Sequence, residues 1–171
     1  MVQFISGRGK MSFSHVIAIG GKPVSKTPAE WLLEHAEVTP ASLSFVWEYW
    51  TDVTYWDDPP AEFLLEGPFE SGVRGMTALP DSDPMHWTLR DVQHEKAYCI
   101  ETDLSDAVLI WEWSFTSLPD GRTRLRQRIG VTGAGAEDAA AGVRQAFGPS
   151  LADGMRRVAR LLAEASARSY D

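Results

Sequence analysis

Residues 108–132 read VLIWEWSFTSLPDGRTRLRQRIGVT, and this stretch decides the fold. Apolar and polar side chains alternate in both halves, which predicts two strands with one buried face and one face in water. Pro119-Asp120-Gly121 between the halves predicts a tight turn, so the two strands form an antiparallel hairpin. The alternation assigns these side chains to the inner face: Leu109, Trp111, Trp113, Phe115, Leu125, Gln127, Ile129 and Val131.

The same period of two extends toward the N-terminus. A first strand is predicted over 31–38, and further strands over 61–66, 73–79, 86–93 and 97–103. The connections between the later strands are shorter than the crossovers that parallel strands require. We therefore expect one antiparallel sheet of about seven strands.

Two helical regions flank this run of strands. Ser42 is a suitable N-cap for a short helix over 43–50, and a second short helical turn is predicted over 53–57. Residues 136–166 predict a long C-terminal helix, which Gly148-Pro149 is expected to kink or briefly break. After that point, apolar side chains recur at helical spacing at Leu151, Met155, Val158, Leu161, Leu162 and Ala165.

The 171 residues fit one domain. Residues 1–28 are rich in Gly, Ser and Lys and are interpreted as an N-terminal extension, and 29–168 as the folded domain. The expected fold class is α+β: a curved antiparallel sheet wrapped around the long C-terminal helix.

This architecture predicts an internal pocket. A sheet of six or seven strands twists and curls, and one helix cannot fill the concave face of such a sheet. Concave apolar sites are typical of small-molecule binding. The side chains expected to line the pocket are Trp50, Phe63, Leu65, Trp87, Tyr98, Trp111, Trp113, Phe115, Gln127, Phe147, Leu151 and Met155.

Three segments carry a resemblance to a known family. Residues 46–53, VWEYWTDV, followed by Trp56, resemble the first helix of the polyketide cyclase/dehydrase branch of the START/Bet v 1-like superfamily. Residues 65–72, LEGPFESG, resemble that branch's second hairpin, and the C-terminal helix is similar too. The resemblance covers about residues 31–166.

The resemblance implies a helix-grip fold, with a seven-stranded sheet around a hydrophobic cavity. It implies a small hydrophobic ligand such as a lipid or polyketide, and in some members cyclisation or dehydration. It supplies no universal catalytic residues, so the catalytic residues are left unassigned.

Polar side chains that face a pocket are the candidates for ligand contacts. Tyr98 and Gln127 fall on the inner face, where a buried phenol or amide needs a hydrogen-bond partner. His86 is opposed to Trp87 in the alternation and is expected to point outward. No convincing inward pair of His or Arg with Asp is apparent, which favours a binding protein over an enzyme.

Charge and composition exclude several classes. Residues 27–120 carry three basic and nineteen acidic side chains, so a nucleic-acid partner is not expected. The row Arg122, Arg124, Arg126 and Arg128 is interpreted as a solvated strand face that pairs with residues such as Glu112. Asp52, Asp57 and Asp58 are attributed to helix termination rather than to a metal site.

The remaining expectations concern partners and location. Neither a metal nor another cofactor is expected. Cys99 is the only cysteine and is interpreted as a structural thiol in a reducing compartment. Because the sequence has no run of 18 apolar residues and no signal-peptide pattern, a cytoplasmic protein without membrane insertion is predicted. A monomer and a homodimer both remain open.

Three functions stay open from sequence. The first is a carrier of a small hydrophobic ligand. The second is a cyclase or dehydratase on the same scaffold. The third is a chaperone-associated interaction module with a packed interior, which an exposed apolar patch would support.

Overall fold

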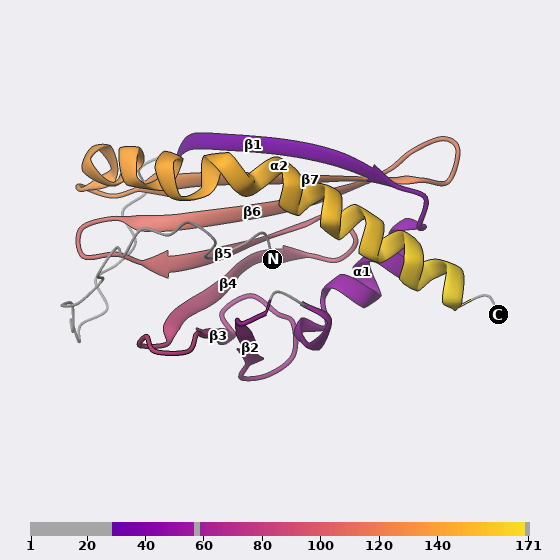
Figure 1. Cartoon of the computed structure of the whole chain (residues 1–171), viewed down its shortest axis with the longest axis horizontal. Coiled ribbons are helices and arrows are strands. Elements are labelled where there is room, and N and C mark those ends of the chain that lie inside the picture. Colours follow the sequence, from indigo (N-terminus) through magenta and orange to yellow (C-terminus); the bar gives the residue numbers. More distant parts are fainter. Residues whose placement is uncertain (1–28, 57–58, 170–171) are drawn as a thin grey trace.

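One antiparallel sheet and one long helix form the body of the protein (Figure 1). The computed structural model describes residues 29–56 and 59–169. The seven strands are ordered β1-β7-β6-β5-β4-β3-β2, so the first strand pairs with the last. The strand bounds are β1 Glu30–Thr39, β2 Glu62–Leu65, β3 Arg74–Ala78, β4 Met85–Gln93, β5 Ala97–Asp103, β6 Val108–Ser117 and β7 Thr123–Thr132.

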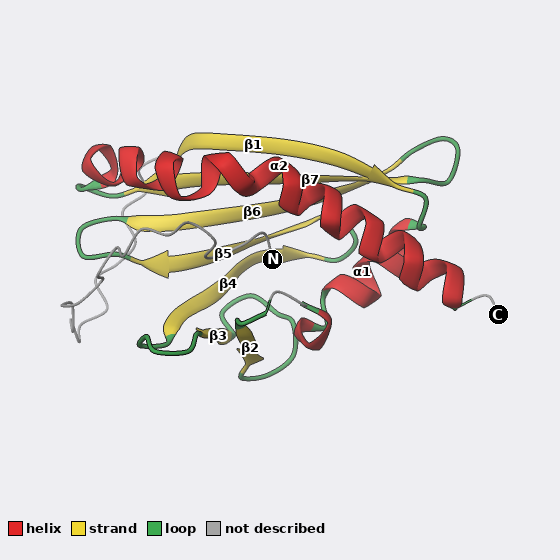
Figure 2. Cartoon of the chain, in the orientation of Figure 1, coloured by secondary structure: helices red, strands yellow, loops and turns green. Residues whose placement is uncertain are grey.

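The helices lie against one face of this sheet (Figure 2). The short helix α1, Leu43–Trp50, begins at Ser42, whose side chain accepts a hydrogen bond from the Phe45 amide. The 3₁₀ turn η1, Val53–Tyr55, follows it and is shorter than the predicted helical turn over 53–57. The long helix α2, Ala136–Arg168, runs beside β1 and then passes α1 (Figure 1).

Most of the sequence predictions of the fold are confirmed. All adjacent strands pair antiparallel, and Gly121 occupies the turn of the β6–β7 hairpin with a φ of 82°. Of the kink or brief break predicted at Gly148-Pro149, the break is absent, because α2 continues through Pro149. Its axis changes direction along its length (Figure 1), as expected of a helix in which a proline removes one backbone donor. The predicted extension over 1–28 lies outside the described residues.

The core lies between the inner face of the sheet and the helices. The inward residues of β6 and β7 that the alternation identified are all buried. The largest fully buried side chains include Trp87, Trp111, Trp113 and Tyr98. The C-terminal half of α2 contributes Leu151, Met155, Val158 and Leu162, which face the same space.

One glycine of the sheet leaves room for an aromatic side chain of the core. Gly75 of β3 lies directly opposite Trp87 of β4. A Cβ at position 75 would overlap the indole ring of Trp87. Only the absence of a side chain at this position therefore lets the Trp87 ring lie flat across β3.

We expect Gly75→Ala to lower the free energy of unfolding by about 1–3 kcal/mol, because the new methyl group forces the Trp87 ring to move. Gly142→Ala is the matched control, since a Cβ there meets open space on α2 and alanine favours a helix. Urea unfolding of both variants measures the difference. Equal stability of the two variants would contradict this account of the Trp87 packing.

Candidate functional site

The predicted pocket residues are brought together at the centre of the molecule. Nine of them are buried: Trp50, Trp87, Tyr98, Trp111, Trp113, Phe115, Gln127, Leu151 and Met155. The other three, Phe63, Leu65 and Phe147, are partly buried and pack against that core. The structure thus groups these side chains, while their role as ligand contacts stays a prediction.

Many of the aromatic rings contact one another. The Trp50 ring lies 5.3 Å from Trp113 and 5.9 Å from Trp56, measured between centroids. Tyr98 stacks on Phe115 at 6.2 Å, and Phe69 from the β2–β3 loop meets Tyr98 edge-on at 4.9 Å. The aromatic side chains therefore form part of the packed core, and a ligand that enters between them must displace rings.

Four residues of this core carry buried polar atoms that make no hydrogen bond within the described part of the chain. They are the indole N–H of Trp50, the hydroxyl of Tyr98, the hydroxyl of Thr102 and both amide atoms of Gln127. Leaving a buried polar group without a partner costs about 1–3 kcal/mol. A core that keeps several such groups is unusual, and it points to a partner from outside the chain.

Two of these residues and a third polar side chain form one row across the sheet. Tyr98 of β5 pairs with Trp113 of β6, Trp113 pairs with Gln127 of β7, and Gln127 pairs with His35 of β1. Since directly paired residues point to the same face of a sheet, this row crosses the inner face over four adjacent strands. We call Tyr98, Trp113, Gln127 and His35 the polar row.

The ionisation of Tyr98 follows from its burial. Complete burial raises the pKa of Tyr98 well above its ordinary value, and the indole N–H of Trp50 partly opposes this effect. The Trp50 and Tyr98 groups nevertheless do not meet hydrogen-bond geometry. At neutral pH Tyr98 is therefore an uncharged phenol with a proton to donate to a partner.

His35 and Glu37 lie on the inner face of β1, and neither was predicted from the sequence as a site residue. His35 Nε2 lies 2.9 Å from Glu37 Oε1, and both side chains are partly buried. The sequence expectation concerned pairs of His or Arg with Asp, and this pair of His with Glu was not considered. The alternation of the strand did contain this information, because Leu33, His35, Glu37 and Thr39 lie at every second position and share one face. With two polar residues on that face, however, the sequence did not indicate which face of the strand is buried.

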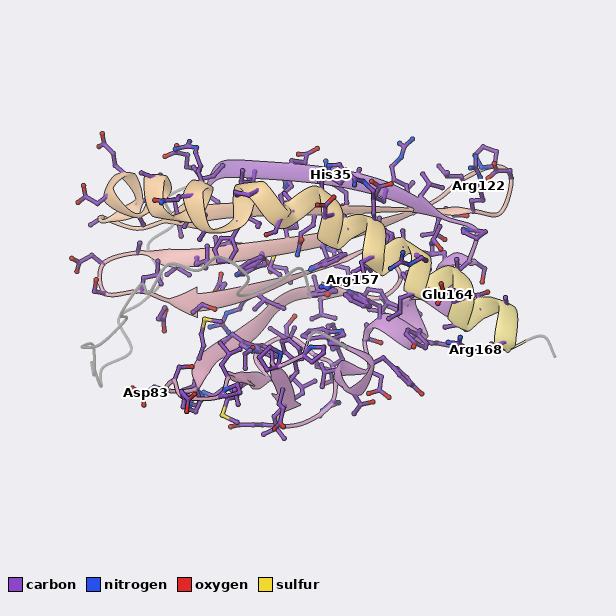
Figure 3. All side chains as sticks on the ribbon, in the orientation of Figure 1. His35, Asp83, Arg122, Arg157, Glu164 and Arg168 are labelled. Atoms are coloured by element: carbon purple, nitrogen blue, oxygen red, sulfur yellow. The ribbon has the colours of Figure 1, made fainter. Side chains whose placement is uncertain are left out.

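Helix α2 borders this pair. Arg156 Nε lies 3.8 Å from Glu37 Oε1, and Arg156 also contacts Asp153 at 2.6 Å on the helix itself. Figure 3 shows His35 on β1 beside α2. The seam between β1 and α2 thus carries charged and titratable groups next to an apolar interior.

A surface cleft of about 210 Å³ lies on the other side of α2, toward α1 and η1. Figure 3 labels two of its wall residues, Arg157 and Glu164, on the C-terminal half of α2. Trp50 also lines this cleft. The indole N–H of Trp50 is also one of the buried groups without a partner in the described part of the chain. The Trp50 side chain therefore lies between the cleft and the buried core.

The remaining polar residues near the site lie outside the interior or have partners within the described chain. His86 is exposed, as predicted. Thr77 accepts a hydrogen bond from the Trp87 indole at 3.1 Å. Asp52 caps η1 through the Thr54 amide, as helix termination predicts, and Asp57 and Asp58 lie outside the described residues.

The outer face of the sheet carries ion pairs. Arg128 makes two hydrogen bonds of 2.8 Å with Glu112 and lies over the Trp31 ring.

Among the described residues, no group of three or more His, Cys, Asp or Glu side chains is placed to hold a metal ion. In the same residues, no helix combines the length and apolar character needed to cross a membrane.

Solved structures of low sequence identity share this fold. Norcoclaurine synthase from Thalictrum flavum, in complex with dopamine and hydroxybenzaldehyde, matches with a TM-score of 0.60 at 11% identity over 88% of this chain and 98% of its own. Zhui aromatase/cyclase from Streptomyces sp. R1128 matches with 0.58 at 16% identity over 84% of this chain and 97% of its own. DynU16, from the dynemicin biosynthetic locus, matches with 0.55 at 18% identity over 81% of this chain.

This chain spans about half of DynU16, since the match covers 49% of that protein. No family model matches the sequence, and no curated protein matches it. At such identities the likeness establishes the fold alone. The chain has a helix-grip fold, which it shares with these solved structures.

Cys99 lies on the outer face of β5 and is partly buried. Burial, together with the nearby carboxylates of Glu112, Asp91 and Glu101, raises the pKa of the Cys99 thiol to about 12, while Arg128 opposes this effect. Because the thiolate is the reactive form, Cys99 is suited to a structural role.

We expect Cys99 in the native protein to react with iodoacetamide at pH 8 at least tenfold more slowly than in the urea-unfolded protein, where its pKa returns to about 8.5. Intact-mass measurement over time gives both rates directly, because the chain has a single cysteine. Equal rates in the two states would show that the thiol is accessible and ionised in the native protein.

Proposed function

We propose that the protein binds a small uncharged molecule with an apolar, ring-shaped body and at least one carbonyl or hydroxyl group. The molecule inserts between the inner face of the sheet and α2, where it displaces aromatic rings of the packed core. The observation that carries the proposal is the set of buried polar atoms, at Trp50, Tyr98, Thr102 and Gln127, that find no partner among the described residues. The indole and phenol donate to a ligand oxygen, while the amide both donates and accepts.

The charge of the ligand follows from the walls of the interior. In the described part of the chain, the buried polar groups belong to Thr, Ser and Gln side chains, to the phenol of Tyr98 and to Trp indoles, and none of them is ionised. A carboxylate or ammonium group transferred there would lose its water without gaining an opposite charge, which is costly. A neutral ligand is therefore favoured over a fatty acid anion.

The shape of the ligand follows from the rings that surround the unpaired groups. Trp113 stands between Tyr98 and Gln127 in the polar row, and Trp50 and Phe115 pack against it. Flat aromatic walls favour flat aromatic or polycyclic ligands, which gain from stacking as well as from burial. The neighbouring proteins with cyclase names and with bound dopamine and hydroxybenzaldehyde support ring-shaped ligands on this fold.

A competing function as an interaction module rests on exposed apolar surface. The large apolar side chains that are exposed in the described part are Trp31, Val38, Tyr55 and Leu64. They come from β1, η1 and β2, which are separate elements. This scatter favours the ligand-binding proposal over a docking surface.

The proposal is tested with three neutral bicyclic aromatic ketones: tetralone, chromanone and acetonaphthone. We expect at least one of them to bind, as measured by quenching of tryptophan fluorescence and by isothermal titration calorimetry. Palmitate should bind at least tenfold more weakly, because its carboxylate finds no buried cation. Failure of all three ketones to bind would overturn the proposal, and tighter binding of palmitate would overturn the neutral class.

The variant Gln127→Leu tests two effects of the unpaired amide separately: its effect on the stability of the protein and its contribution to ligand binding. We expect this variant to be more stable than the wild type without ligand by about 1–3 kcal/mol, because it removes two buried unpaired atoms. The same change should weaken ketone binding about tenfold, while naphthalene, which has no polar group, should bind the variant as well as the wild type. Gln93→Leu, on the exposed end of β4, is the control and should alter ketone affinity little. Unchanged ketone affinity in Gln127→Leu would remove Gln127 from the site.

A further inference from the structure

The pair formed by His35 and Glu37 has the arrangement of an acid–base group. Glu37 Oε1 contacts His35 Nε2 at 2.9 Å, which fixes the imidazole ring and favours a proton on that nitrogen. The other ring nitrogen, Nδ1, makes no hydrogen bond within residues 29–56 and 59–169. A histidine oriented by a carboxylate, with its second nitrogen unoccupied, is the usual form of a general base.

The position of the pair links it to the proposed ligand. His35 lies opposite Gln127 in the β1–β7 register, so both side chains face the interior with Cβ atoms about 5 Å apart. Neither amide atom of Gln127 bonds to His35 or to any other described group. When a ligand carbonyl accepts a hydrogen bond from Gln127 Nε2, the carbon atom next to that carbonyl therefore lies near the imidazole ring of His35.

A catalytic base must also exchange its proton with water before the next turnover, and His35 is in contact with solvent. The His35 side chain is 30% exposed at the seam between β1 and α2, whereas Gln127 is fully buried. A proton taken from a buried ligand can thus pass to water through His35. Among the described residues, Glu37 on β1 contacts the imidazole, and Glu37 in turn lies near Arg156 of α2, which pairs with Asp153.

We propose that His35 is a catalytic base that removes a proton from the carbon next to a ligand carbonyl, with Glu37 as its positioning residue and Gln127 as the donor to the carbonyl oxygen. The inference rests on the proposed function, since it needs a neutral carbonyl ligand in the interior. It assigns to the protein a proton-transfer activity on enolisable ketones.

The step balances without an added reactant. The C–H bond breaks and its electron pair forms the enolate, with the negative charge on the oxygen that faces Gln127. His35 gains the proton and becomes an imidazolium, which the Glu37 carboxylate stabilises. Return of a proton from His35 to carbon or oxygen regenerates neutral imidazole and gives the ketone or its enol.

The experiment is exchange of the hydrogens next to the carbonyl with D₂O, followed by proton NMR, with tetralone, chromanone and acetonaphthone as probes. The wild-type protein should accelerate exchange at least tenfold over buffer that contains an equal concentration of imidazole. His35→Ala should reduce the enzymatic rate by about 100-fold or more, the contribution typical of one general base. Glu37→Gln should reduce it less, and Glu37→Asp should restore part of the loss.

Two controls separate catalysis from structure. His86→Ala removes an exposed histidine on the opposite face of the sheet and should leave the rate unchanged. Added imidazole should restore exchange to the His35→Ala variant, an effect that a structural role would not produce. His35→Gln, which keeps the size of the side chain, serves if the alanine variant does not fold by circular dichroism.

The outcomes distinguish the two proposals. A ketone that binds but exchanges no faster than in buffer overturns the catalytic inference and leaves the binding function intact. Wild-type exchange in His35→Ala overturns it as well. Binding of none of the three ketones overturns both.

Discussion

The structure depends on a mismatch between the inner face of a seven-stranded sheet and the one long helix that covers it. Pairing of β1 with β7 places the first and last strands together beneath α2. Large aromatic side chains fill much of the space that the helix leaves, because they bury the most area per residue. The rings cannot, however, satisfy the polar atoms that lie among them. Within residues 29–56 and 59–169, Tyr98, Gln127, Thr102 and Trp50 keep buried polar groups without a partner.

These unpaired groups connect stability to function. A fold selected for stability alone would carry Phe and Leu at such positions, since apolar residues of similar shape avoid the desolvation cost. Retaining a phenol and an amide there is understandable if a ligand supplies their partners. Proteins commonly give up stability where a site must bind or react. The outer face of the sheet differs from the core in this respect, because the Arg128 guanidinium donates two hydrogen bonds to the Glu112 carboxylate, so that each group has its partner within the chain.

The polar row is a product of strand register. Its members come from positions 35, 98, 113 and 127, which lie far apart in the sequence but side by side across four strands. Tyr98, Trp113 and Gln127 were identified from alternation, because their own strands have regular apolar neighbours that mark the buried face. His35 and Glu37 were missed, because β1 is an edge strand whose inward positions include two polar residues. Edge positions beneath one helix are only partly buried, so the pattern of hydrophobicity is weak there.

The sequence by itself determined the elements and their faces, since period two, period 3.6 and the turn residues are local properties of the chain. It also determined that Gln127 and Tyr98 point inward, although it did not reveal that both lack a protein partner. Only the tertiary structure decided which side chains meet, because pairing between strands depends on register and on the path of α2. The His35–Glu37 pair next to Gln127, the contact of Arg156 with Glu37, and the continuation of α2 through Pro149 all follow from packing that no local pattern records.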